Sequence, residues 1–416
     1  MSPAAPATTR PPPPRDAAWD VARGAGVLCV IAAHSVGPYL SRPLPGLLWP
    51  VYEPAPGLWQ PTDPSQGPAP APTDVLFWLI RAFTVPLFFF IAGLFAAQSM
   101  SREGPRAFLR SRLQRLGAPL LAGYFLVMPL VYVVWVWGWV RFGYAAWEHL
   151  RHMRFGPAVQ PNLHGFGHLW YLWYLLLMCT GAAAWTLIAP AKPPPPPDAA
   201  AHQDTRAALR VLAPAALALL VLVPVAALLP TAVQVFQNGF FPRAGFFLFH
   251  AMFFMWGWAA SAPMLDPHSA PRRWTARLSP LLIIAGALCA LQMLWTLFPA
   301  LHIHQNQPPP TLLTPKERWR VGVLASGAAL LLVPGVVGTA SALAHRAPAW
   351  LPALGRRSLW VYTTHMPWVG LVAVALFKVP LPAELKAAAA FAAALAMSLL
   401  TRRVFSATAV GRWLGA

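Results

Sequence analysis

Long apolar runs are the feature that most constrains this chain. Of its 416 residues, 57% are hydrophobic and only 10% are charged, whereas soluble domains carry about 25% charged residues. Lipid cannot hydrogen-bond an exposed backbone, so only helices or closed barrels cross a bilayer. The runs here are apolar on all faces and lack the alternation of barrel strands. We therefore expect an all-α, polytopic membrane protein with about ten transmembrane helices of ~20 residues each. These predicted spans lie near 19–40, 75–97, 117–140, 168–189, 208–229, 243–261, 279–299, 320–340, 358–377 and 383–405.

The distribution of Lys and Arg predicts the topology. These residues are more frequent in the loops that share a side with the N-terminus, and cytoplasmic loops carry such an excess. Both termini are therefore expected to be cytoplasmic, with residues 17–405 forming the transmembrane domain. A Pro-rich tail over 1–16 and a short tail over 406–416 flank it, with no cleavable signal peptide. Residues 41–73 form a long outer loop, and residues 190–207 form a Pro-rich cytoplasmic linker.

The net charge of +19 has two possible interpretations. A basic chain can bind nucleic acid, but in a membrane protein loop cations set the topology and contact anionic lipid. We favour the second reading, with membrane lipid as a partner and no nucleic acid. The three cysteines, Cys29, Cys179 and Cys289, lie within apolar runs and have no metal-ligand spacing. They are expected to be packing residues, with neither a disulfide framework nor a bound metal.

The stretch RGAGVLCVIAAH, from Arg23 to His34, contains two ionisable side chains in the first predicted span. Eleven residues of α-helix place both on one face, about 16–17 Å apart along the axis. Asp20 lies three residues before Arg23 and can pair with it. His34 falls past the bilayer centre, where burial favours a neutral imidazole, which is a competent general base. The alternative is that Arg23 is a topology charge and His34 a hydrogen-bonded packing residue.

Arginines also gather before the third predicted span, at Arg110, Arg112 and Arg115. Guanidinium groups bind phosphate in bidentate fashion, so this cluster is a candidate site for a nucleotide-like cofactor. The alternative is a plain topology signal on the cytoplasmic side. Composition alone favours that alternative.

Two further blocks place polar and aromatic residues at the ends of spans. His168 and Trp170 open the fourth span in HLWYLWYLLL, where aromatics stack on sugar rings or form an interfacial belt. Ser358, Tyr362 and His365 lie near one face of the span in SLWVYTTHMP. Such a polar stripe lines a cavity or joins neighbouring helices.

Taken in order, these blocks resemble the acyltransferase 3 family of membrane acyltransferases. The resemblance covers nearly the whole chain and rests on DVARGAGVLCVIAAH, PLFFFIAGLF, RSRLQRLGAP, HLWYLWYLLL, FFLFHAMFFMWGW and LGRRSLWVYTTHMP. Two of these blocks, HLWYLWYLLL and SLWVYTTHMP, look most like the branch that contains the glucan biosynthesis protein C type. Proteins of that type decorate periplasmic glucans with succinyl groups.

The resemblance implies an acyl-CoA-dependent O-acyltransferase in a bacterial-type inner membrane. The acyl group would pass from cytoplasmic acyl-CoA to a hydroxyl of an extracytoplasmic glycan or other carbohydrate-containing acceptor. His34 matches the essential histidine of the family, Arg23 its basic partner and Asp20 the preceding acidic residue. Arg112 and Arg115 match its cytoplasmic arginines.

The same resemblance assigns the later blocks to substrate binding. His168 and Trp170 fit its His-Leu-Trp block, and Ser358, Tyr362 and His365 fit its late Ser-Leu-x-x-Tyr-x-x-His block. Tyr362 and a backbone amide are both candidates for stabilising the oxyanion. The acyl group, the acceptor, the oligomeric state and the existence of an acyl-enzyme intermediate stay open.

A different class of function competes with the enzyme. A secondary transporter or flippase for a polar lipid or glycan could use His34 and His365 as a proton relay. Transporters often carry inverted repeats with broken helices, and the sequence shows neither clearly. The enzyme is therefore the favoured reading.

Overall fold

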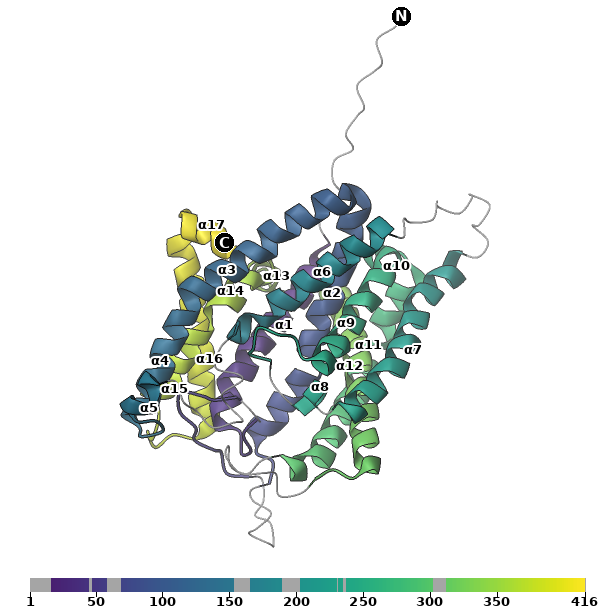
Figure 1. Ribbon diagram of the computed structural model, residues 1–416. Coiled ribbons are helices and arrows are strands. Elements are labelled where there is room, and N and C mark those ends of the chain that lie inside the picture. Colours follow the sequence, from purple (N-terminus) through teal and green to yellow (C-terminus); the bar gives the residue numbers. More distant parts are fainter. Residues whose placement is uncertain are drawn as a thin grey trace, which may run out of the picture.

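The computed structural model describes residues 16–44, 47–57, 69–152, 165–188, 203–229, 231–234, 237–301 and 312–415, and these form one bundle of helices (Figure 1). Within these ranges the regular elements are all helical. The longer helices are α1 (Ala17–Val36), α2 (Pro72–Arg112), α4 (Met128–Arg141), α6 (Trp170–Ile188), α7 (Gln203–Leu228), α9 (Ala244–Ala259), α11 (Ala270–Leu297), α12 (Pro315–Leu343), α15 (Met366–Ala375) and α16 (Ala383–Phe405). The shorter helices are α3 (Ala118–Ala122), α5 (Trp147–Arg151), α8 (Thr231–Gln234), α10 (Ser261–Leu265), α13 (Trp350–Arg356), α14 (Ser358–Thr364) and α17 (Ala409–Leu414).

Each predicted span coincides with helix. Seven helical segments of the described chain are long and apolar enough to cross a membrane, and α9 and α15 are shorter apolar helices. The prediction of an all-α, multi-pass membrane protein is therefore confirmed. The number of crossings and the side on which the termini lie stay predictions. The seven segments are Ala17–Tyr39, Pro72–Arg141, Gly167–Ile188, Asp204–Leu228, Ala270–Ala300, Pro315–Leu343 and Ala383–Phe405.

The second and third predicted spans are joined by helix instead of a loop. One helical run extends over Pro72–Arg141 and turns at Gly104, whose φ of 74° lies in the left-handed region. Glycine adopts that conformation at no steric cost, and Pro105 prevents a regular continuation. The two predicted spans are thus the arms of a kinked helical run.

The predicted span over 358–377 is likewise divided. α14 ends at Thr364 and α15 starts at Met366, with His365 between them. Pro367 occupies the first turn of α15 and lacks the N–H that would continue the helix. The break therefore places His365 at a bend inside the bundle.

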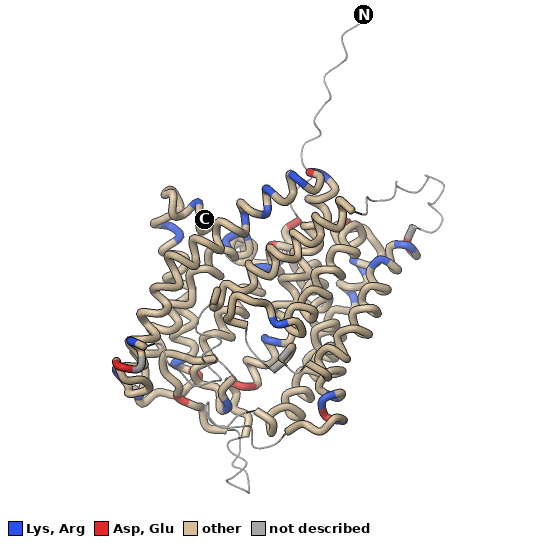
Figure 2. Tube along the Cα trace, viewed as in Figure 1, with Lys and Arg blue, Asp and Glu red and all other residues tan. Residues whose placement is uncertain are grey.

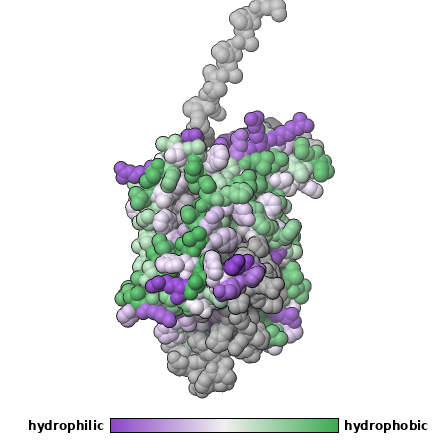
Figure 3. Space-filling view, turned by 60° about the vertical axis from the view of Figure 1, so that its left-hand side comes forward, coloured by the Kyte–Doolittle hydropathy of each residue, from purple (hydrophilic) through white to green (hydrophobic). Residues whose placement is uncertain are grey.

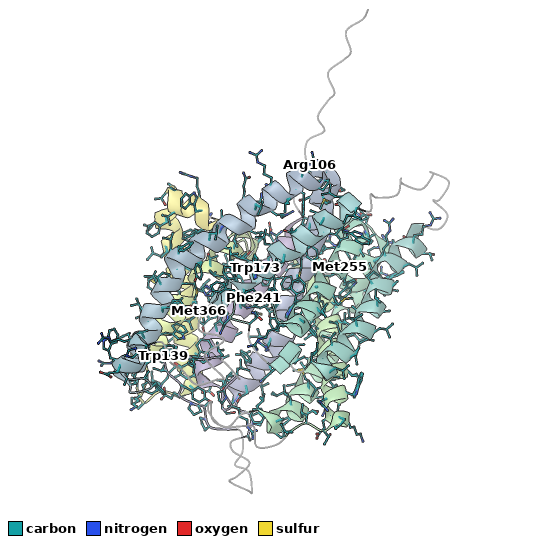
Figure 4. The ribbon with its side chains drawn as sticks, in the orientation of Figure 1. Arg106, Trp139, Trp173, Phe241, Met255 and Met366 are labelled. Carbon is teal, nitrogen blue, oxygen red and sulfur yellow. The ribbon has the colours of Figure 1, made fainter. Side chains whose placement is uncertain are left out.

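The two ends of the bundle differ in charge. Figure 2 shows Lys and Arg concentrated at its upper end, and Figure 4 places Arg106 there and Trp139 toward the lower end. We name the upper end, which carries Arg102, Arg106, Arg110 and Arg115, the basic end. α17 also lies there (Figure 1). The topology prediction makes the basic end cytoplasmic.

An apolar belt separates the two ends. On the face shown in Figure 3, hydrophobic residues cover a broad middle zone and hydrophilic residues gather at its upper edge. Phe125 and Val133 leave 67% and 66% of their surface exposed. Exposed apolar residues in such a belt are expected to contact lipid.

The predicted tails and linker are covered only in part. Residues 1–15 and 190–202 lie outside the described ranges, as do parts of the outer loop, 45–46 and 58–68. α7 starts at Gln203, so the last residues of the predicted linker over 190–207 are helical. The predicted C-terminal tail over 406–416 contains α17.

α1 occupies the interior of the bundle and packs closely on α13. A Cβ built on Gly24 would clash with the carbonyl oxygen of Leu351, and one built on Gly355 would clash with the carbonyl oxygen of Asp20. Glycine at both positions therefore allows the two backbones to meet. This packing fixes the face of α1 that carries Asp20, Arg23 and His34.

Candidate active site

A single cavity joins the two ionisable residues of α1. It has a volume of about 950 Å³, and both Arg23 and His34 line it. At 1.5 Å per residue they lie about 16 Å apart along the helix. The predicted shared face of α1 is thus the wall of a cavity that runs from the basic end into the bundle.

His34, which lines this cavity, is hydrogen-bonded to a second histidine. Its Nδ1 lies 2.8 Å from Nε2 of His365, and the two rings stack with centroids 5.0 Å apart. His365 is fully buried at the bend between α14 and α15. The two residues are 331 positions apart in the sequence, so the fold alone brings them together.

Backbone carbonyls determine which nitrogens carry protons. His365 Nδ1 lies 3.0 Å from the carbonyl oxygen of Val361 and 2.8 Å from that of Tyr362. A carbonyl only accepts, so this nitrogen is the donor, and Nε2 of a neutral His365 is an acceptor. His34 Nδ1–H therefore donates to His365, and Nε2 is the basic nitrogen of His34.

A third histidine packs against this pair. The His168 ring lies edge-on to that of His365, with centroids 5.5 Å apart, and its Nε2 donates to the carbonyl oxygen of Thr363 at 3.1 Å. Its Nδ1 is buried and has no hydrogen-bond partner among the described residues. Because Nε2 donates, Nδ1 of a neutral His168 ring is an acceptor, and His168 lines the cavity.

The hydroxyl of Tyr362 is already engaged. It donates to the carbonyl oxygen of His168, and a phenol has one proton to donate. Tyr362 lines the cavity, but in this arrangement it does not supply a donor for an oxyanion. The expectation that it stabilises the oxyanion therefore lacks support from this geometry.

Asp20 organises the part of α1 nearest the basic end. Its carboxylate lies 3.4 Å from Arg23 and 3.5 Å from Arg356, and Asp20 itself is only 3% exposed. The Arg23 guanidinium also lies over the Phe95 ring, 5.1 Å from its centroid. The predicted pairing of Asp20 with Arg23 is present, with Arg356 as a second partner that the sequence did not indicate.

The predicted arginine cluster divides into two groups. Arg112 and Arg115 line the cavity, whereas Arg110 is exposed and does not. Arg112 donates to the Ser99 hydroxyl at 2.8 Å. Arg102, which the sequence analysis did not single out, also lines this part of the cavity.

Two of the three remaining predicted site residues line the cavity. Ser358 lines the cavity at the start of α14. Trp170 lines it at the start of α6 and packs edge-on against His250, with centroids 5.4 Å apart. His365 is not among the lining residues, because it lies behind His34.

Arg81 and His250 are cavity-lining residues that the sequence analysis left without a role. Each is an ionisable side chain within a strongly apolar segment. Such residues usually face a bundle interior or a wet cavity, and this rule alone would have singled them out.

The predicted outer loop also contacts His34. The Trp49 ring lies beside that of His34, with centroids 6.5 Å apart. Lys386 Nζ pairs with the Glu53 carboxylate at 2.7 Å and anchors the loop to α16. Burial raises the pKa of the Tyr52 phenol, so its hydroxyl stays protonated and donates to the Leu40 carbonyl at 2.7 Å.

A family model described as an acyltransferase domain, that of acyltransferase 3, matches residues 16–403. The chain belongs to the acyltransferase 3 family. The match spans α1 to α16 and therefore includes every residue that lines the cavity. The resemblance noted in the sequence is confirmed at the level of the family, and the chain is a membrane acyltransferase. Its placement in the glucan biosynthesis protein C branch stays a prediction.

Two further comparisons gave no match. Neither the curated proteins nor the solved structures contain a significant relative of this chain.

Proposed function

We propose that this acyltransferase moves an acyl group from acyl-CoA at the basic end to a hydroxyl of a carbohydrate acceptor on the opposite side, with His34 as general base. The observation that carries this proposal is the bond between His34 and His365. Because His365 accepts from His34 Nδ1–H, the basic nitrogen of His34 is Nε2. His34 lines the cavity in which a substrate would lie.

The donor enters where the cationic side chains gather. Arg23, Arg112 and Arg115 line the cavity near the basic end, and guanidinium groups suit the phosphates of CoA. The cavity then leads about 16 Å along α1 to His34. A thioester on an extended arm thus reaches the histidine while its phosphates stay at the entrance.

The chemical step needs one base and returns its proton. His34 Nε2 takes the proton of the acceptor hydroxyl, and the oxygen attacks the thioester carbonyl carbon. The C–O bond forms, the C–S bond breaks, and the CoA sulfur receives the proton from His34. General-base catalysis of this kind contributes ~10²–10⁴-fold.

His365 acts through His34 as a positioning residue. While His34 carries the transferred proton, its Nδ1–H still donates to His365 Nε2, so the ring keeps its orientation throughout the step. The backbone carbonyls of Val361 and Tyr362 hold His365 in the required tautomer. This arrangement is analogous to the orienting acid of a catalytic triad.

The donor and the reaction class are tested with the purified protein in lipid nanodiscs. Radiolabelled acyl-CoA and a hydroxylated acceptor are mixed, with the free radiolabelled acid replacing acyl-CoA in the control. We expect acceptor labelling that requires the thioester. Movement of the acceptor across the membrane without labelling would instead support the transporter. Mass spectrometry of envelope glycans with and without the protein then identifies the acyl group and the acceptor.

A further inference from the structure

Arg81 is a cavity-lining arginine that the proposed transfer does not use. It lies on α2, about 14 Å from the start of that helix at 1.5 Å per residue. A cation at this depth is costly and usually faces a functional cavity. Arg81 is also distinct from the arginines of the basic end, because α2 reaches that end only near Arg102.

The contacts of Arg81 fix the direction of its side chain. One terminal nitrogen donates to the carbonyl oxygen of Val233 at 3.1 Å, and the guanidinium lies 5.7 Å from the Trp78 ring centroid. A guanidinium carries five N–H donors. A single guanidinium can therefore hold several acceptors at once.

Val233 belongs to the short helix α8, which lies between α7 and α9 in the chain. Gln237 is 1% exposed, and its side-chain amide donates to the carbonyls of Gly239 and Phe241 at 2.8 and 2.9 Å. Figure 4 shows Phe241 close to Trp173, between the two ends of the bundle. Ala232 and Val233 of α8 line the same cavity as Arg81, so this short helix forms part of the cavity wall.

The cavity is also lined by His250, which lies among aromatic residues. His250 Nδ1 donates to the Phe246 carbonyl at 2.7 Å, so Nε2 of a neutral ring is an acceptor. Trp170 and Phe246 pack around this ring. Arg81, His34 and His250 all line the same cavity. The cavity that contains the proposed base thus also contains a cation and aromatic faces.

We propose that Arg81 binds a carboxylate or phosphate carried by one of the two substrates, so that this enzyme transfers an acidic acyl group or modifies an acidic acceptor. The inference rests on the proposed function, because it takes His34 as the point where the two substrates meet. An arginine inside a low-dielectric cavity holds a carboxylate or phosphate through charge-assisted bonds. The aromatic walls accommodate the uncharged remainder of the substrate.

The two possible sources of the anionic group are tested in separate arms. The donor arm compares succinyl-CoA with butyryl-CoA, which has the same chain length without the terminal carboxylate. The acceptor arm compares octyl glucuronide with octyl glucoside. Each arm uses the full-length protein and the variants Arg81→Gln and Arg81→Lys, with Arg106→Gln as control because Arg106 is exposed and outside the cavity.

We expect a preference for the charged partner in one arm. Arg81→Gln should reduce that preference at least about tenfold, as expected for a lost hydrogen bond to a charged group. Arg81→Lys should keep part of it, and Arg106→Gln all of it. The arm that responds identifies the substrate that carries the charge. Absence of any charge preference, or a preference that survives in Arg81→Gln, overturns the proposal. An equal loss of activity with charged and neutral substrates also overturns the proposal. Such a loss would mean that Arg81 acts on a group that both substrates share, such as the reacting oxygen.

A binding measurement separates this inference from the proposed transfer. Thermal stabilisation of the purified protein by succinate or octyl glucuronide, relative to butyrate or octyl glucoside, requires no turnover. Stabilisation by the charged compound that Arg81→Gln removes supports the anion site even if no thioester is used. Failure of the proposed function would instead appear as a lack of acyl transfer from every acyl-CoA.

Discussion

His34 Nδ1 lies 2.8 Å from His365 Nε2, and His365 Nδ1 donates to two backbone carbonyls behind it. This chain of bonds runs in one direction, from His34 to the bend between α14 and α15. It makes Nε2 the basic nitrogen of His34, and the catalytic proposal depends on it.

Replacing His365 tests the positioning role. His365→Ala should lower kcat by about 10²-fold, within the range of general-base catalysis, with little change in KM because His365 does not line the cavity. His365→Gln should recover part of the loss, since its side-chain carbonyl can accept from His34 Nδ1–H. Steady-state kinetics of both variants provide the measurement. Equal activity of the two variants would argue against an orienting acceptor.

The arginines of the basic end are tested through the phosphates of the donor. Arg112→Gln should raise KM for acyl-CoA roughly 10- to 100-fold, as expected for lost bonds to a charged group. The exposed Arg110, which lies outside the cavity, provides the matched control Arg110→Gln. With an acyl-pantetheine donor, which lacks the nucleotide phosphates, the two variants and the unmodified protein should have similar KM values. An Arg112 effect that persists with acyl-pantetheine would exclude phosphate binding.

Gly355 tests the close packing of α13 on α1. A Cβ at this position clashes with the Asp20 carbonyl, so Gly355→Ala should destabilise the protein by ~1–3 kcal/mol. Nothing lies within 4 Å of a Cβ built on Gly181 in α6, and Gly181→Ala should leave the stability unchanged or raise it slightly. Thermal unfolding in detergent compares the two. A similar melting temperature for both variants would contradict the packing described here.

The buried Lys386 tests how the outer loop is held. Its side chain is 2% exposed and pairs with Glu53 at 2.7 Å. Glu53→Gln leaves the buried lysine charge without its carboxylate. Because the Glu53 side chain is 32% exposed, we expect a loss of about 1.5–3 kcal/mol, as for a hydrogen bond to a charged group. Adding Lys386→Met should restore much of the lost stability. A double-mutant cycle of melting temperatures measures this coupling, and strictly additive effects would indicate that the pair does not hold the loop.

Local patterns were sufficient to predict the helices and one face of the site. Apolar runs indicated the spans, and helical spacing placed Arg23 and His34 on one wall, because both follow from residues close in sequence. The kink at Gly104 was missed, since an apolar run on each side of a charged segment resembles two helices joined by a loop.

Contacts between distant segments could not be predicted in this way. His34 meets His365, and Asp20 meets Arg356, only after α1 packs against α13 and α14. Arg81 was visible in the sequence as an intramembrane cation. Its place in the cavity that His34 also lines depends on how α2 and α8 pack, and no local sequence pattern indicates this packing.

The transfer rate of a His34→Ala variant tests the central claim most directly. Purified protein is assayed with radiolabelled acyl-CoA, and acyl-CoA binding is measured on the same preparation. We expect binding close to that of the unmodified protein and a transfer rate lower by ~10²–10⁴-fold, the usual contribution of a general base. A variant that binds acyl-CoA and still transfers the acyl group at nearly the normal rate would contradict the role assigned to His34.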